Sequence, residues 1–234
     1  MCGRYTSITP VEELARYFGV EEVVADDLGP RYNVAPTDTI YAVARRGDGL
    51  RLGALRWGLV PPWAEDVRVG ARLINARAES VADKPAFRQA FARRRCLLPA
   101  DGFYEWQRRD GASSGQPWYV RRDDGQPLAL AGLWETWRPQ GRDEDRVVSA
   151  TIVTTAANRS LAPIHHRMPV VLAADAWPFW LDPANHDIDA LLRLLVPAPE
   201  DMLSPVAVKP LVNRVTNDGP ALVEAITRQE TTQG

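Results

Sequence analysis

The second residue of the chain combines a reactive side chain with a position that allows particular chemistry. Cys2 follows Met1 directly, and an initiator methionine is commonly removed when the next residue is small. Cys2 would then carry a free α-amine beside its thiol, with ordinary pKa values of about 7.7–8.0 and about 8.5. Such a 1,2-aminothiol reacts with an aldehyde, because the amine forms an imine and the thiol closes on it to give a thiazolidine ring. The pattern favours a carbonyl substrate; the alternative interpretation is a disordered terminus whose second residue happens to be cysteine.

The other residues that commonly bind metals do not predict a metal site. Cys2 and Cys96 are the two cysteines and His165, His166 and His186 the three histidines, so no CxxC, HExxH or similar ligand spacing occurs. Two cysteines also exclude a disulfide-rich scaffold and favour a reducing compartment. We therefore expect no metal and no cofactor. Cys96 is expected in a buried strand, because apolar residues follow it directly.

Six short segments combine glycine, proline, aromatic and polar residues in a specific order. They are 1–5 (MCGRY), 31–37 (RYNVAPT), 56–63 (RWGLVPPW), 75–79 (NARAE), 95–106 (RCLLPADGFYEW) and 165–169 (HHRMP). In this order they resemble the signature blocks of the SRAP family, named for "SOS response-associated peptidase" and known for covalent capture of abasic sites in single-stranded DNA. The resemblance extends over roughly the first three-quarters of the chain, with no departure at a catalytic position.

The resemblance implies roles for four residues. Cys2 matches the crosslinking nucleophile, in agreement with its aminothiol chemistry. His165 matches the catalytic histidine, and an imidazole with an ordinary pKa of about 6.5 suits protonation of the ring oxygen of a closed abasic sugar. Glu105 is implied to hold and deprotonate the α-ammonium of Cys2, and the strand-like run around it would project its carboxylate from one face of a sheet. Asn75 is implied to orient the sugar and the nucleophile rather than to transfer protons.

Four further residues of these segments are expected to contact DNA. The chain has 28 Lys and Arg against 30 Asp and Glu, a formal net charge of −2, so its overall field does not attract a polyanion and DNA binding needs a local patch. Arg4, Arg77 and Arg167 would supply guanidinium contacts to phosphates. Trp63, after two prolines, would supply a stacking platform for a base, although a core position is nearly as compatible with its sequence.

Three functions remain in competition at this point. The preferred hypothesis is covalent capture of abasic sites in single-stranded DNA through a thiazolidine at Cys2 after removal of Met1. The first alternative is a thiol peptidase, or autopeptidase acting on Met1, with Glu105 and His165 as base and acid; it would need an oxyanion hole and a peptide cleft, which the sequence does not indicate. The second alternative is a non-covalent single-strand binder.

The elements that must position these residues are mostly short strands. Helices are predicted from Thr9, as N-cap, to Gly19, and over 80–95, 175–181 and 187–195. A hairpin is predicted over 39–59, and strands over 96–106, 118–122, 128–137, 147–155, 168–173 and 206–215. Because the helices do not alternate with the strands, the pattern predicts an α+β fold with an antiparallel, barrel-like sheet core and short peripheral helices.

The chain is expected to form a single domain over 1–234, with a flexible tail at 216–234. Nowhere do eighteen apolar residues follow one another, and no apolar leader follows Met1. These features predict a soluble, cytoplasmic monomer that associates with the nucleoid when bound to DNA.

Overall fold

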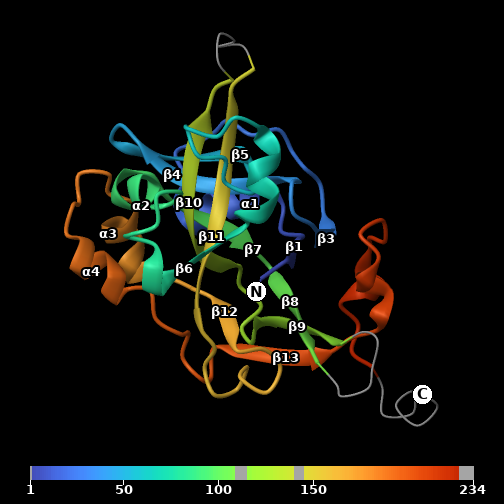
Figure 1. Ribbon diagram of the computed structural model, residues 1–234. Helices are drawn as coiled ribbons and strands as arrows, with labels where there is room; N and C mark the ends of the chain where they lie inside the picture. The colour runs from blue at the N-terminus through green and yellow to red at the C-terminus, as the bar shows by residue number, and fades with distance from the viewer. Residues whose placement is uncertain (1, 109–114, 140–144, 227–234) are drawn as a thin grey trace.

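Two β-sheets with short helices around them make up the protein (Figure 1). The computed structural model describes residues 2–108, 115–139 and 145–226. Most strand pairs are antiparallel; the exceptions are β2–β5, β5–β11 and β6–β11. The α+β fold class predicted from the sequence is confirmed.

The larger sheet contains a closed ring of strands. The ring strands are β4 (Thr39–Arg46), β5 (Gly49–Trp57), β7 (Arg95–Ala100), β10 (Leu128–Trp137) and β11 (Val147–Ala156). Each pairs with its neighbour, and β11 closes the ring by pairing in parallel with β5, with Ser149 opposite Arg56. Shorter strands attach to it: β2 (Glu22–Val23), β6 (Asn75–Arg77) and β12 (Arg167–Pro169). The expected barrel-like core is therefore present as a ring of strands and not as a strict barrel.

The smaller sheet carries the beginning of the chain. Its order is β13 (Leu203–Ala207), β9 (Gln116–Arg122), β8 (Gly102–Gln107), β1 (Arg4–Ser7) and β3 (Arg31–Val34), all antiparallel. The run predicted as one strand over 96–106 is two strands, because the chain crosses from the ring to this sheet at Asp101. The Asp101 carboxylate accepts the backbone N–H groups of Ile8 and Thr9, so the crossing is tied to the end of β1.

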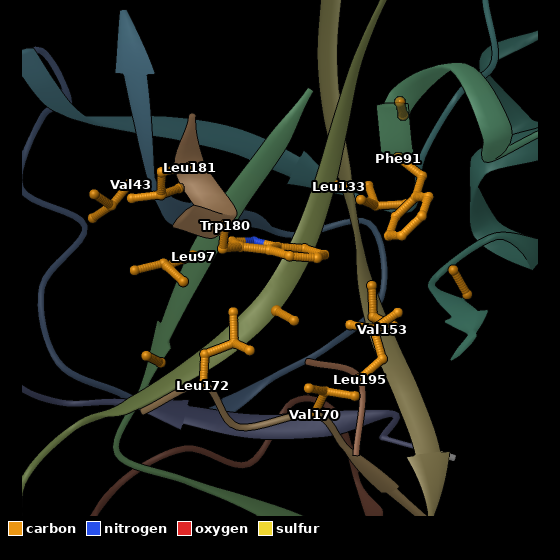
Figure 2. Packing of buried hydrophobic residues seen from close by; sticks show 14 of the residues in the cluster. Val43, Phe91, Leu97, Leu133, Val153, Val170, Leu172, Trp180, Leu181 and Leu195 are labelled. Atoms are coloured by element: carbon orange, nitrogen blue, oxygen red, sulfur yellow. The ribbon is translucent and has the colours of Figure 1, made fainter. Parts of the chain in front are cut away.

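The largest apolar cluster packs ring strands against helices. Trp180 and Phe91 come from helices, whereas Leu97, Leu133 and Val153 come from ring strands (Figure 2). Trp180 is fully buried, and its indole N–H donates to the carbonyl of Cys96 at 2.9 Å, so its one polar group is satisfied. Cys96 is also fully buried, as the sequence predicts.

The two helices predicted in the first half of the chain are present with different limits. Helix α1 (Val11–Phe18) ends at Gly19, whose φ of 64° is left-handed, but its N-cap is Pro10 because the hydroxyl and N–H of Thr9 bind Asp101. Of the helix predicted over 80–95, only α2 (Arg88–Arg93) forms. Arg95 belongs to β7 and is buried, with its guanidinium donating to backbone carbonyls.

The remaining helices are short. They are α3 (Trp177–Leu181), α4 (Ile188–Arg193) and the 3₁₀ turns η1 (Val67–Arg72), η2 (Ala78–Ser80), η3 (Ala174–Ala176), η4 (Pro210–Asn213) and η5 (Pro220–Leu222). The strand predicted over 206–215 stops at Ala207, since the chain turns into η4 at Pro210. Within the described ranges, no helix is long and apolar enough to cross a membrane.

Several contacts attach the first part of the expected tail to the fold. Leu222 is 3% exposed, Ala225 forms a β-bridge with Val208, and the carboxylate of Asp218 accepts the backbone N–H of Tyr32 at 2.6 Å. Most other side chains of residues 216–226 are exposed or half-buried. Residues 227–234 of the expected tail lie outside the described residues.

Candidate functional site

The site is built around Cys2, two residues before β1. Strand β1 lies between β8 and β3, and Cys2 itself is fully buried. The amide of Asn75 donates from Nδ2 to the carbonyl of Cys2 at 2.9 Å. Asn75 begins β6, which pairs in parallel with β11 through Asn75 and Ile152, so the ring holds the start of the chain through this side chain. The Oδ1 atom of Asn75 is buried without a hydrogen-bond partner among the described residues.

Glu105 and His165 meet beside this terminus. The antiparallel register of β1 and β8 places Arg4 opposite Tyr104, so the residues before Arg4 run toward Glu105 and Trp106. The carboxylate oxygen Oε2 of Glu105 lies 4.0 Å from Nδ1 of His165. His165 belongs to the loop between β11 and β12. The structure thus brings together all four residues to which the sequence assigns catalytic roles.

Burial changes the acid–base properties of the group. It raises the pKa of the Glu105 carboxyl above its ordinary value of 4.5, because a charged carboxylate loses hydration there. It also raises the pKa of the Cys2 thiol, with a further contribution from the negative charge of Glu105. The thiolate fraction near neutral pH is therefore smaller than the ordinary pKa used in the sequence analysis would give. The thiol proton must be removed during any reaction in which sulfur attacks.

The backbone of Arg167 contacts the imidazole of His165. The N–H of Arg167 can donate to Nδ1 at 3.0 Å, and a protonated Nδ1 can donate to the carbonyl of Arg167 at 3.2 Å, so both states of this nitrogen have a backbone partner. Burial lowers the pKa of His165 below 6.5, and the positive charge of His165 lowers that of His166, whose ring centre lies 4.4 Å away. The lowered pKa favours the neutral imidazole near pH 7 and makes the imidazolium a stronger acid.

A surface pocket opens beside His165. It has a volume of about 340 Å³, and its walls include Trp106, Arg108, Pro163, His165 and His166. A second hollow, too small for a water molecule, shares His165 with this pocket and is lined also by Phe103, Glu105 and Arg167. A small polar group in the pocket would be within reach of the imidazole.

Two of the residues expected to bind DNA have a side chain open to solvent. Arg77 ends β6 next to the Asn75 position, is exposed, and has no carboxylate partner in the described part of the chain. Trp63 is 62% exposed, which supports a surface role over a core role. Within the described ranges, it makes no hydrogen bond or ring contact with Cys2 or with the three site residues Asn75, Glu105 and His165.

Arg4 and Arg167 are instead engaged within the protein. Nη1 of Arg4 donates to Oδ1 of Asn33 at 2.8 Å and to the carbonyl of Val212 at 2.9 Å. Arg167 forms a two-point ion pair with Glu79, at 2.5 and 3.0 Å, and also donates to the carbonyl of Thr154 at 2.7 Å. The Arg167 side chain is only 11% exposed, so its first observed role is to join β12 to the loop after β6.

Metal binding finds no support in the geometry. Across residues 2–108, 115–139 and 145–226, no three His, Cys, Asp or Glu side chains gather closely enough to hold an ion. The chemistry available at the site is that of a thiol, a carboxyl, an imidazole and an amide.

A buried cysteine near the start of the chain thus lies beside a carboxyl and an imidazole on a mixed α+β framework. The chain belongs to the SOS response associated peptidase (SRAP) family, whose family model matches residues 1–215. The family resemblance seen in the sequence is thereby confirmed.

Similar proteins cover nearly the whole chain. The abasic site processing protein YoqW of Bacillus subtilis (strain 168) is 39% identical over 227 residues, covering 96% of this chain and 100% of that protein. The abasic site processing protein YedK of Escherichia coli (strain K12) is 30% identical over 234 residues, covering 97% and 100%. A crystal structure of a protein from Bacteroides thetaiotaomicron has a TM-score of 0.84 at 21% identity, covering 97% of this chain and 100% of that chain, and shows the same fold.

Proposed function

We propose that this protein captures abasic sites in single-stranded DNA covalently, through a thiazolidine formed by Cys2 after removal of Met1. The observation that carries the proposal is the convergence of Asn75, Glu105 and His165 on a cysteine at the start of the chain. The names of the similar proteins support handling of abasic sites. Removal of Met1, which lies outside the described residues, is the step that frees the amine.

The bond changes balance without a cofactor. The neutral amine of Cys2 adds to C1′ of the opened sugar, and loss of one water gives the imine. The thiol sulfur then adds to the same carbon, while the thiol proton is transferred to the nitrogen. The product is a five-membered ring with C–N and C–S bonds to C1′, which hydrolyses far less readily than the imine.

The two titratable neighbours of Cys2 suit different proton transfers. Glu105, with its raised pKa, accepts a proton from the α-ammonium, which must be neutral to attack. His165, in its imidazolium form, donates a proton to the ring oxygen of the closed sugar, so that the aldehyde opens. Asn75 orients the Cys2 carbonyl and therefore the direction of the nucleophiles.

Mass spectrometry tests the proposal directly. The mature protein is mixed with a uracil-containing oligonucleotide that has been treated with uracil-DNA glycosylase, and the adduct is denatured, digested and mapped. We expect loss of Met1 and an adduct at Cys2 that survives denaturation. Cys2→Ser should bind the DNA without a stable adduct, whereas Cys96→Ala, the matched control, should retain it because Cys96 is buried in β7. Retained Met1, or an undiminished adduct in Cys2→Ser, would defeat the mechanism.

His165→Ala separates ring opening from positioning. If His165 protonates the sugar, single-turnover capture of a closed abasic sugar should slow by about 10²–10⁴-fold, while reaction with a small, already open aldehyde should change far less. Equal losses with both substrates would leave His165 as a positioning residue.

The alternatives give different outcomes in the same experiments. A thiol peptidase would cleave added peptides and form no adduct with the sugar, and an autopeptidase would release Met1 and do nothing further. A non-covalent binder would retain DNA only under native conditions. The buried thiol with Glu105 and His165 beside it is compatible with autoproteolysis at Met1, which would then be the maturation step of the capturing protein.

A further inference from the structure

The loop that carries His165, residues 157–166, joins two strands of the larger sheet but packs against the smaller sheet. Leu161 is 3% and Ile164 8% exposed, and both belong to the apolar cluster that contains Cys2. Apolar packing is non-directional. By itself it does not fix where the imidazole lies relative to the reactive groups of the smaller sheet.

A directed contact between this loop and the smaller sheet comes from Gln107, the last residue of β8. Its Nε2 donates to the carbonyl of Pro163 at 3.0 Å, two residues before His165. Gln107 and Glu105 are two positions apart on β8, so their side chains project from the same face of the sheet. The strand that carries the carboxyl therefore also holds the loop that carries the imidazole.

The orientation of the Gln107 amide is fixed by a second strand. Trp118, on β9, donates from Nε1 to Oε1 of Gln107 at 3.3 Å. Because the amide oxygen accepts this N–H, the amide presents its NH₂ group to Pro163. Trp118 lies directly opposite Glu105 in the antiparallel register of β8 and β9, so the indole is a cross-strand neighbour of the carboxyl. The three side chains thus form one group on the face that the His165 loop covers.

The beginning of the loop is held by a different part of the chain. The carboxylate of Glu200 accepts the backbone N–H groups of Arg159 and Ser160 at 2.9 and 3.0 Å. These contacts act six residues before His165, whereas Gln107 acts two residues before it. The place of the imidazole should therefore depend more closely on Gln107 than on Glu200.

The proposed reaction requires the imidazole to be well placed. The ring oxygen that receives its proton is bonded to C1′, the carbon that the amine of Cys2 attacks. The proton donor and the nucleophile must therefore converge on adjacent atoms of one sugar. Oε2 of Glu105 and Nδ1 of His165 lie 4.0 Å apart. Because a displacement of about 1 Å can cost about 10²-fold in rate, a small shift of the loop would slow the reaction.

We infer that Gln107 is a positioning residue for the capture reaction and holds the His165 imidazole beside Glu105 through its hydrogen bond to Pro163. The inference rests on the proposed function, because it takes His165 as the proton donor to the abasic sugar. Loss of the Gln107 amide should displace the imidazole. It should leave Glu105 in place, because β8 remains paired with β1 and β9.

Single-turnover rates of Gln107→Ala test the inference. Capture of a closed abasic sugar in single-stranded DNA should slow by about 10- to 100-fold, whereas reaction with a small, already open aldehyde should change far less. Affinity for DNA that carries a tetrahydrofuran abasic analogue, which has no aldehyde, should be unchanged. Gln116→Ala is the matched control, because Gln116 lies opposite Gln107 and donates to the carbonyl of Val208. It should leave both rates unchanged.

A double variant separates positioning from a general effect. In His165→Ala there is no imidazole to position, so adding Gln107→Ala should cause no further loss with the closed sugar. Multiplied losses would mean that Gln107 acts independently of His165 and would overturn the inference. An unchanged rate in Gln107→Ala alone, or equal losses with both substrates, would overturn it as well.

Titration of His165 by NMR, in protein without DNA, gives a readout that does not depend on capture. Burial lowers the pKa of His165, so a displaced and better hydrated ring in Gln107→Ala should have a pKa closer to 6.5. The titratable and charged groups around the ring are the same in both proteins: Glu105, Arg108, His166 and Arg167. An unchanged pKa would overturn the inference. Absence of a Cys2 adduct in the unchanged protein, with the pKa shift present, would instead defeat the proposed function and leave Gln107 as the residue that positions the imidazole.

Discussion

The ring of strands and the neighbourhood of Cys2 bury very different side chains. On the face of the ring that the helices cover, Leu97, Leu133 and Val153 pack with Trp180 of α3, and the polar indole N–H is satisfied by a carbonyl. Around Cys2, the polar groups include the buried carboxyl of Glu105 and the amide of Asn75, which donates to the Cys2 carbonyl. Burial of the first set stabilises the fold, whereas burial of a carboxyl opposes folding unless the group is protonated or well bonded.

The difference separates stability from reactivity. The ring strands stabilise the framework that carries the site. The carboxyl of Glu105, by contrast, is held where ionisation is unfavourable. Substitutions in the ring should therefore lower stability without changing the chemistry of the folded fraction. Substitutions at the site should change the capture chemistry without lowering the stability of the fold.

The largest expected effect on stability is that of Trp180→Ala. Removal of a fully buried indole should lower the free energy of unfolding by about 3–5 kcal/mol, through lost burial and the cavity that remains. Denaturant unfolding measures the change. At low temperature, the fraction that remains folded should still capture abasic DNA at the normal rate, and a proportionate loss of rate would show that ring and site are coupled.

Glu105→Gln should slow capture without lowering stability, the opposite of Trp180→Ala. Because the folded-state pKa of Glu105 is raised, the stabilisation that its protonated form contributes is present at low pH and is lost as the pH rises through the folded pKa. The amide keeps the shape without that loss, so stability at pH 7 should be equal or higher, while the capture rate falls by about 10²–10⁴-fold.

A pH profile of single-turnover rates checks the role of Glu105 independently. In the unchanged protein, the limb controlled by Glu105 should have its midpoint above the ordinary 4.5 of a glutamate. In Glu105→Gln this limb should disappear. The rate should instead increase with pH around a midpoint at the ordinary pKa of the α-amine, about 7.7–8.0. An unchanged profile would exclude Glu105 as the base.

Glu79→Gln probes an ion pair at the border between the two regions. The Arg167 guanidinium holds the pKa of Glu79 below its ordinary value, so the stability that this pair contributes is present above pH 4.5 and is lost as the pH falls through the lowered pKa. The half-exposed pair should be worth about 1 kcal/mol or less. Releasing Arg167 should also steepen the salt dependence of DNA binding; an unchanged slope would mean that Arg167 does not bind phosphate.

Arg77→Ala should have the smallest effect on the fold. An exposed side chain without an ion-pair partner among the described residues should change stability by no more than about 0.5 kcal/mol. The salt slope of single-strand binding should become shallower by ~0.7, the contribution of one phosphate contact. An unchanged slope would place the phosphate track elsewhere.

Local sequence patterns predicted the elements that depend on local contacts. The alternating residues around Gly47 gave the β4–β5 hairpin, and Gly19 gave the end of α1. The parallel closure of the ring by β5 and β11 was not predictable, because it joins residues about 93 positions apart through backbone bonds that carry no side-chain pattern. The division at Asp101 was also missed, since its reason is the remote N–H groups of Ile8 and Thr9.

At the site, residue types predicted the reactive groups but not their partners. Cys2, Glu105 and His165 were identifiable because their chemistry and segment context are specific. The pairing of Arg167 with Glu79 was missed, although Glu79 lies in the 75–79 segment and its charge was the available signal. The shared role of Asn33 and Arg4 in fixing residues 209–217 depends on contacts across 181 and 208 positions, and no local pattern indicates it.

The central place of β1 in its sheet determines how the terminus responds to mechanical force. A pull on Cys2 along the strand loads the hydrogen bonds to β8 on one side and to β3 on the other in shear, so they must break together rather than one after another. Just after the other end of β1, the Asp101 carboxylate accepts hydrogen bonds from the backbone N–H groups of Ile8 and Thr9. A force on a group joined to Cys2 is therefore shared between the two strands that flank β1.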